Sequence, residues 1–218
     1  MIRVEYNEEK WRFPFVAYLP EAYAAAQKVE EESVKLPLIV QLHGAGERGH
    51  GAEELHLVDV HGFSKMMDQV DESCIFVMPQ CPADTFWAAR VESIIVFIEQ
   101  VIKAFPVDEK RVSLTGLSMG GFGTWYTAMA RPELFACIAP HCGGGMAWNA
   151  GRLDMPVWVF HGTADKTVSV NQSDEMVEKL RELGREVTYS RLDGVGHNVQ
   201  DYSFGKELLE WMLRQKRA

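Results

Sequence analysis

The chain has 218 residues, of which 47% are hydrophobic and 24% charged, a length and composition that predict a single domain over residues 1–218. Its formal net charge of -9 argues against nucleic acid as a partner, because phosphates require a basic surface. The first ten residues have no apolar core and are unlike a signal peptide, and no stretch approaches the roughly 18 apolar residues that span a membrane. The four cysteines lack Cys-x-x-Cys spacing, so we expect reduced thiols in a cytoplasmic protein.

The first 36 residues divide into two parts. Residues 1–20 predict a β-hairpin, with alternation at Val4 and Tyr6 followed by an extended run over 11–19. Pro14 lies in that run and has no N–H group for a ladder hydrogen bond, so we place the run at a sheet edge. Residues 21–36 are rich in Ala and Glu and fit a short helix or a loop that ends at Pro37.

From residue 38 onward, apolar runs of strand length alternate with segments of helical character. Continuous apolar runs are typical of parallel strands that are buried on both faces. The alternation predicts an α/β fold with a mainly parallel central sheet and helices on both faces. No long insertion separates Pro140 from Pro156, so we expect no large cap domain. The expected strands cover 38–42, 74–78, 111–115, 135–140, 156–160 and 187–192, and the expected helices 63–70, 88–104, 122–131, 170–184 and 202–214.

One serine stands between an expected strand and an expected helix, in the sequence Gly116-Leu117-Ser118-Met119-Gly120. Gly-x-Ser-x-Gly in that context is the nucleophile-elbow pattern, in which the serine occupies a strained turn. Side chains at the two glycine positions would collide across so tight a turn. Ser118 is therefore the predicted nucleophile, and the alternative is a Gly-Ser turn without chemistry.

Asp165 and His197 follow later strands, which gives the chain order Ser…Asp…His of the α/β-hydrolase fold. A serine hydroxyl needs a base to accept its proton, and the imidazole needs a carboxylate that orients it. Asp193 is the rival acid, since it lies in the same loop as His197. Asp154 precedes its strand and is expected at the opposite end of the sheet.

The remaining histidines are assigned mainly to structure. His43 and His161 also stand at strand ends, each followed by Gly, and we interpret both as structural. His141 fits either a residue that lines the site or a structural one. His50, His56 and His61 lie close in sequence, but no spacing puts two of them on one helical face, so we expect no metal.

Attack of a serine on a carbonyl group creates an oxyanion, which needs preorganised N–H donors. One is expected from Met119, the residue after the nucleophile. The other is expected from the glycine-rich loop after strand 38–42, at Ala45 or Gly46. The same loop lacks the Gly-Lys-Ser/Thr ending of a phosphate-binding loop.

Four further residues are candidates for contact with substrate or for structure. Glu47 and Arg48 fit either a local ion pair or an arginine that anchors a polar or carboxylate group of the substrate. Trp87 ends a proline-rich loop and fits either an aromatic wall of the pocket or core packing. Trp148 is expected near the site, because it lies in a Gly-rich loop after a strand. Two other tryptophans, Trp125 and Trp211, are expected in the core.

Three stretches of the chain together resemble the small α/β-hydrolase serine esterases: residues 42–49, residues 79–82 with Trp87, and residues 114–125. The group named predicted peptidases, with the feruloyl-esterase-like and polyhydroxybutyrate-depolymerase-like esterases, is the most similar. Phospholipase/carboxylesterase and dienelactone-hydrolase relatives are similar at a greater distance. The matches run from about residue 38 to 198.

This resemblance implies an α/β-hydrolase fold, a triad of Ser118, Asp165 and His197, and an oxyanion hole at Ala45 and Met119. Residues 1–36 are shorter than the immunoglobulin-like or cap regions of some relatives, so the resemblance leaves substrate selection open. The sequence predicts a hydrolase that cleaves a small-molecule carboxylic ester through an acyl-enzyme, without a cofactor. Thioester or peptide hydrolysis on the same triad, or a non-catalytic binding protein of the same fold, are the alternatives.

Overall fold

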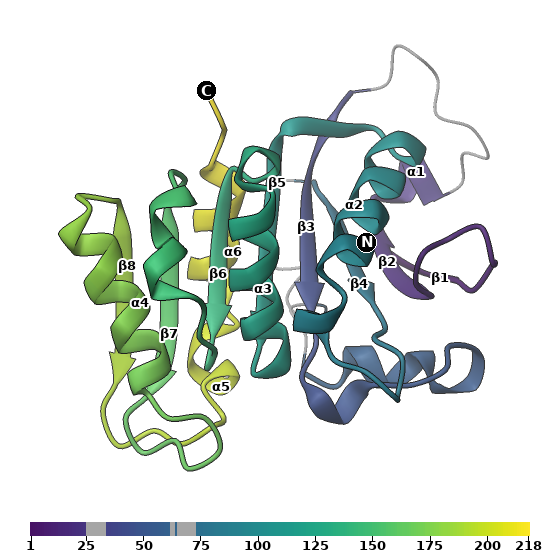
Figure 1. The fold of residues 1–218 in the computed structure, drawn as a ribbon. Helices are drawn as coiled ribbons and strands as arrows, with labels where there is room; N and C mark the ends of the chain where they lie inside the picture. Colours follow the sequence, from purple (N-terminus) through teal and green to yellow (C-terminus); the bar gives the residue numbers. More distant parts are fainter. Residues whose placement is uncertain (25–33, 62–63, 65–72) are drawn as a thin grey trace.

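A computed structural model describes residues 1–24, 34–61, 64 and 73–218 of the chain. Its centre is an eight-stranded sheet (Figure 1). The strands are β1 (Ile2–Tyr6), β2 (Phe15–Leu19), β3 (Leu36–Leu42), β4 (Ile75–Pro79), β5 (Val107–Leu117), β6 (Cys137–His141), β7 (Val157–Gly162) and β8 (Val187–Leu192). Their order across the sheet is β1-β2-β4-β3-β5-β6-β7-β8. β2 runs antiparallel to β1 and β4, and the neighbouring pairs from β4 to β8 are parallel.

Helices cover both faces of the sheet, which explains why the central strands are apolar without alternation. Strands β3, β4 and β6 are buried along their whole length. Figure 1 shows α2, α3 and α4 on one face and α6 on the other. The helices are α1 (Glu21–Ala24), α2 (Val91–Ala104), α3 (Met119–Ala130), α4 (Asn171–Glu182), α5 (Gln200–Ser203) and α6 (Lys206–Arg214). The expected α/β fold, with a mainly parallel sheet and helices on both faces, is confirmed.

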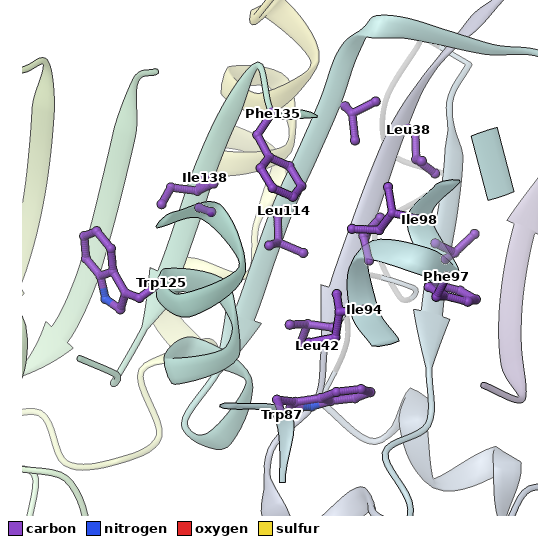
Figure 2. Packing of buried hydrophobic residues seen from close by; sticks show 14 of the residues in the cluster. Leu38, Leu42, Trp87, Ile94, Phe97, Ile98, Leu114, Trp125, Phe135 and Ile138 are labelled. Carbon is purple, nitrogen blue, oxygen red and sulfur yellow. The ribbon is translucent and has the colours of Figure 1, made fainter. Parts of the chain in front are cut away.

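The larger part of the core lies between the sheet and the helices α2, α3 and α4. Figure 2 shows Trp87, Ile94 and Phe97 packed against the strand residues Leu38 and Leu42, with Trp125 farther along the same layer. A second cluster, on the other face, includes Leu208, Leu209, Met212 and Leu213 of α6. The core thus holds the strand ends, and with them the loops that follow, in fixed positions.

Three expectations about the elements need correction or restriction. The run around Pro14 is not at a sheet edge, because β1 pairs with the other side of β2 and Pro14 itself precedes the strand. The expected helix over 202–214 is two helices, α5 and α6, which are separated at Phe204 and Gly205. The expected helix over 63–70 and most of the stretch 21–36 lie outside the described residues, and Pro37 lies inside β3 at a register irregularity.

The connection between β6 and β7 contains one short 3-10 helix, Ala147–Arg152, and adds no separate layer over the sheet. Within the described ranges, every helix is too short or too polar to cross a membrane. The carboxyl ends of β3, β5, β7 and β8 lie at one edge of the sheet, at the bottom of Figure 1, so the loops that follow them converge there.

Candidate active site

Ser118 occupies the turn between β5, which ends at Leu117, and α3, which begins at Met119. Its backbone angles are φ 57° and ψ -116°, outside the conformations that a side chain ordinarily allows. Such a conformation costs about 1–3 kcal/mol and persists only where the surroundings enforce it. One restraint is the hydrogen bond from the Ser118 N–H group to the carbonyl of His141, at 2.9 Å.

Gly116 and Gly120 are close to backbone atoms on the two sides of this turn. A Cβ on Gly116 would lie 2.4 Å from the carbonyl oxygen of Gly120, and a Cβ on Gly120 would lie 1.9 Å from that of Leu42. Real Cβ atoms essentially never approach so closely. The two glycines therefore allow the elbow to contact the end of β3, which places Ser118 beside the loop that follows Leu42.

The structure brings Ser118, His197 and Asp165 together from three separate loops. Nε2 of His197 lies 2.8 Å from Oγ of Ser118, and its Nδ1 lies 2.6 Å from Oδ2 of Asp165. A carboxylate only accepts hydrogen bonds, so Nδ1 of His197 carries the proton. Nε2 can then accept a hydrogen bond from the hydroxyl of Ser118. The side chain of Asp165 is fully buried, and that of His197 is 28% exposed.

The carboxylate of Asp165 is held by several donors. Its Oδ1 accepts from the N–H groups of Thr167, at 2.8 Å, and Val168, at 2.9 Å. Burial alone would raise the pKa of Asp165, but the hydrogen bonds from His197 and these two N–H groups lower it below its usual value. Asp165 is therefore ionised throughout the neutral range.

The loop that carries His197 packs directly on the end of β7. The N–H group of Ala164 donates to the carbonyl of Val195 at 2.9 Å, and a Cβ on Gly162 would lie 2.2 Å from the same oxygen. The rival acid Asp193 accepts instead from the hydroxyl of Thr163, at 3.1 Å, and is exposed. The geometry thus places Asp165, and not Asp193, against the imidazole.

A cavity of about 440 Å³ opens at Ser118 and His197. Ala45 and Gly46, the expected donors of the glycine-rich loop, line it and are exposed. Met119 is the first residue of α3, so its N–H group is one of the donors that a helix leaves without an internal partner. The cavity is therefore bordered by the serine, the imidazole and the loop expected to supply N–H groups.

Other candidate residues lie elsewhere. Trp87 is fully buried and its Nε1 donates to the carbonyl of His43, so it packs in the core and does not line the cavity. His141 is also fully buried and stacks on Phe160 at 4.6 Å. Trp148 is 79% exposed, in the short helix between β6 and β7, and is absent from the cavity lining among the described residues.

Arg48 does not form the expected ion pair with its neighbour Glu47. Its guanidinium donates to the carbonyls of Ala45, at 2.9 Å, and Thr85, at 3.2 Å. Arg48 therefore fastens the loop, and no substrate carboxylate is needed to explain it. Glu47 is buried, and it is the member of the pair that lines the cavity.

His43 and His161 have the structural environments expected for them. Nε2 of His43 accepts from the N–H group of Cys81 at 2.9 Å, while Nδ1 contacts the carbonyl of Gly44 at 2.6 Å. His161 contacts the hydroxyl of Ser173 and the carbonyl of Val168, and its Nε2 lies 3.4 Å from Oδ2 of Asp165.

Two residues in or beside the site were missed by sequence reasoning. The thiol of Cys142, which directly follows β6, forms a hydrogen bond with Asp165, and its backbone has a positive φ of 45°. Gln200 lines the cavity from the start of α5. The sequence offers a weak signal for Cys142, its place after a strand at the same sheet edge, and none for Gln200. Among the described residues, the possible metal ligands that cluster are Cys142, His161 and Asp165, within 4.8 Å, and Asp165 already holds His197.

Two buried histidines near the site predict a loss of stability in mild acid. Burial lowers the pKa of His43 to about 4 and that of His141 to about 3. In the unfolded chain, both side chains have the ordinary histidine pKa of about 6.5. Below that pH, the unfolded chain therefore binds more protons than the folded one. The free energy of unfolding should then fall by about 2–3 kcal/mol per pH unit as the pH drops from 6 to 5.

Urea unfolding at several values between pH 7 and 5 measures this slope. The variant His141→Phe, which keeps a ring beside Phe160, should lower the slope by about 1.4 kcal/mol per pH unit. The variant His56→Gln removes an exposed histidine and should keep the full slope. A free energy of unfolding that stays constant from pH 6.5 to 5 would contradict the neutral, buried state of the two rings.

The chain matches the family model described as Phospholipase/Carboxylesterase over residues 84–208. A bifunctional acetylxylan esterase/xylanase of Neocallimastix patriciarum is 28% identical over 152 residues, which are 67% of this chain and 22% of that protein. Among solved structures, a thermostable esterase has a TM-score of 0.83 and 31% identity, covering 99% of this chain and 63% of that one. A feruloyl esterase module of Clostridium thermocellum has a TM-score of 0.65 and 15% identity, covering 100% and 89%.

These findings confirm the resemblance to α/β-hydrolase esterases. The feruloyl esterase likeness concerns the fold alone, because the identity is low. The chain spans 22% of the length of the acetylxylan esterase/xylanase and 63% of that of the thermostable esterase. The family match covers more than half of the 218 residues, and the chain therefore belongs to the phospholipase/carboxylesterase family.

Proposed function

We propose that the protein is a serine hydrolase that cleaves carboxylic esters through an acyl-enzyme. One observation carries the proposal: a continuous hydrogen-bonded series runs from Ser118 through His197 to Asp165, and its serine end opens into a cavity. An isolated serine–histidine contact occurs for many structural reasons. A strained serine, a base within 2.8 Å and a buried ionised acid behind that base meet the requirements of nucleophilic catalysis together.

In the proposed acylation step, Oγ of Ser118 attacks the carbonyl carbon of the ester while Nε2 of His197 accepts the hydroxyl proton. The resulting imidazolium is stabilised by the carboxylate of Asp165, which also fixes the tautomer. Collapse of the tetrahedral intermediate breaks the bond to the alcohol oxygen, and His197 returns its proton to that oxygen. Water then attacks the acyl group by the same route in reverse and releases the carboxylic acid and Ser118.

The N–H groups of Met119 and of Ala45 or Gly46 are the proposed donors to the oxyanion. The positions of these residues support the proposal, because α3 begins directly after the nucleophile and the loop with Ala45 and Gly46 borders the cavity. Removing one such donor in other serine hydrolases costs about 10²–10³ in kcat. Backbone donors require no reorganisation when negative charge develops on the carbonyl oxygen.

A small-molecule carboxylic ester is the proposed substrate class. The cavity of about 440 Å³ is adequate for a small ligand, and the similar thermostable esterase and acetylxylan esterase/xylanase are both named for ester hydrolysis. A cytoplasmic location is the proposal that accompanies this assignment. It is supported by the four cysteines, which are all buried and form no disulfide bond.

Hydrolysis of p-nitrophenyl acetate, measured before and after treatment with a fluorophosphonate, tests the assignment. We expect hydrolysis by the untreated protein, loss of activity after treatment and one phosphonyl group on Ser118. A panel that adds a thioester and a peptide anilide separates the three hydrolase classes. Absence of both hydrolysis and labelling in the folded protein would identify a binding protein of the same fold.

The thiol of Cys142 predicts a smaller effect on the same reaction. Replacing Cys142 with alanine removes a hydrogen bond to Asp165 but leaves the donors from His197, Thr167 and Val168. Because a thiol is a weak donor, kcat should fall by about three- to tenfold with little change in KM. The variant Cys142→Ser keeps a donor and should restore most of kcat. An unchanged kcat in Cys142→Ala would mean that the thiol does not help to position Asp165.

A further inference from the structure

Glu47 is a buried residue in the lining of the active-site cavity. Its side chain is 8% exposed, and it lines the same cavity as Ser118. The position that a Cβ on Gly44 would occupy lies 3.1 Å from Oε2 of Glu47 and 3.9 Å from Cβ of Ser118. The carboxylate and the serine are thus within one side chain's length of each other.

Oε2 of Glu47 has no hydrogen-bond donor among the described residues. The ring nitrogen Nδ1 of His43 lies 3.7 Å from Oε2 and is directed to the carbonyl of Gly44 at 2.6 Å. Burial lowers the pKa of His43 to about 4, so the ring is neutral and does not compensate the charge. His61, 45% exposed, lies 3.6 Å from the other oxygen of Glu47, beyond hydrogen-bond distance.

Arg48 and Gln80 also leave Oε2 without a partner. Arg48 donates to two backbone carbonyls, and the amide of Gln80 donates to the backbone carbonyl of Glu47. A buried carboxylate oxygen without a donor destabilises the folded protein, because it has lost its hydrogen bonds to water. Because Glu47 lines the cavity, a ligand there that donates a hydrogen bond to this oxygen would offset the cost.

A second acceptor without a partner lines the same cavity. Oε1 of Gln200 is buried and has no hydrogen-bond donor among the described residues. No lysine or arginine is among the described residues that line this cavity. The cavity therefore presents acceptors without cationic groups, which disfavours an anionic substrate and favours one that donates hydrogen bonds.

A hydroxyl group fits this lining better than an ammonium group does. The amide of Gln200 and the ring of His61 can donate as well as accept. A hydroxyl group both donates and accepts, so it can use all of these groups, whereas an ammonium group only donates. A site built for a substrate hydroxyl discriminates strongly against the analogue that lacks it.

We infer that the enzyme acts on hydroxylated esters, in which a hydroxyl group close to the scissile bond donates to Oε2 of Glu47. Gln200 is the second residue that selects such substrates. This inference rests on the proposed ester hydrolysis at Ser118 and names the substrate class of that site. Plain alkyl esters are poorer substrates, because they leave Oε2 of Glu47 and Oε1 of Gln200 without a hydrogen-bond donor.

Matched esters test the inference on the purified chain. On the alcohol side, kcat/KM for 2-hydroxyethyl acetate is compared with that for propyl acetate. On the acyl side, methyl glycolate is compared with methyl propionate. Each preference is measured in the wild type and in Glu47→Gln, so the intrinsic reactivity of the esters cancels. We expect a preference for the hydroxyl ester in at least one pair, lowered about tenfold by Glu47→Gln.

Glu53→Gln is the matched control, because it removes the same charge from an exposed position outside the cavity lining. It should keep the preference of the wild type. If Glu47→Gln does not fold, Gln200→Met is expected to lower the same preference several-fold. Equal preferences in wild type and in the folded variant would overturn the inference. So would a Glu47-dependent preference confined to acetylcholine over 3,3-dimethylbutyl acetate, which would indicate a cation.

The fluorophosphonate reaction separates this failure from failure of the proposed function. A protein that labels at Ser118 and hydrolyses both members of each pair, but without a contribution from Glu47, retains the proposed function and loses the inference. A folded protein that neither labels nor hydrolyses any ester loses both.

Discussion

Ester hydrolysis is expected to fall by roughly 10⁴–10⁶-fold in kcat when Ser118 is replaced with alanine, with the fold unchanged. The hydroxyl oxygen is the proposed nucleophile. Among the described residues, no other hydroxyl group forms a hydrogen bond with His197. The substitution should leave the packing around residue 118 unchanged, because alanine keeps the Cβ. Initial rates with p-nitrophenyl acetate, together with the thermal unfolding midpoint, measure both parts of this expectation.

The effects on kcat of substitutions at Ser118, His197 and Asp165 should not be additive, because the three side chains act together. Ser118→Ala combined with His197→Ala should be no slower than Ser118→Ala alone, because the base has no function without the nucleophile. Asp165→Asn should lower kcat by about 10⁴-fold, since the amide favours the wrong tautomer of His197. Asp193→Asn is the matched control, as this residue binds Thr163 and not the imidazole. A larger loss in Asp193→Asn than in Asp165→Asn would contradict the assigned acid.

Gly120→Ala is expected to have the largest effect on folding. Its Cβ would lie 1.9 Å from the carbonyl oxygen of Leu42 and 2.8 Å from that of His43. Both atoms belong to backbone at the end of β3, where buried neighbours on both faces prevent displacement. Overpacking of a core costs about 1–3 kcal/mol, and a backbone clash of this kind should exceed that range.

The result expected for Gly120→Ala is either no soluble protein or a free energy of unfolding lower by at least about 3 kcal/mol. Any soluble Gly120→Ala protein should also have a lower kcat than the wild type, because a shift that relieves the clash moves Ser118 away from the loop at Ala45. Gly151→Ala provides the control, since its Cβ would have only an ordinary contact at 3.8 Å. Equal unfolding midpoints for the two variants would show that β3 and the elbow are not packed as described.

The sheet and the elbow could be predicted because their signals are local. Each central strand carries a continuous apolar run, and the elbow requires glycines at fixed spacing around one serine. The selection of Asp165 and His197 followed from chain order and from the rule that parallel strand ends converge. What the structure adds is the distances that bring the three side chains together.

Tertiary contacts decided one expectation that failed and two that the sequence left open. Pro14 indicated an edge strand, but its position just before β2 leaves the ladder intact. Trp87 ends a loop at the correct edge of the sheet, yet it turns inward against Phe13 at a centroid distance of 5.4 Å. The sequence Glu47-Arg48 gives no indication of which side chain points toward the cavity, because a loop has no fixed periodicity.

Rapid acid quenching of the protein with p-nitrophenyl acetate, followed by peptide mapping, tests the proposed mechanism most directly. We expect an acetyl group on the peptide that contains Ser118, formed within the first turnover and absent from Ser118→Ala. Its amount should decay at the rate of acetate release as substrate is exhausted. Continued turnover with no adduct, or with the acetyl group on another residue, would contradict an acyl-enzyme at Ser118.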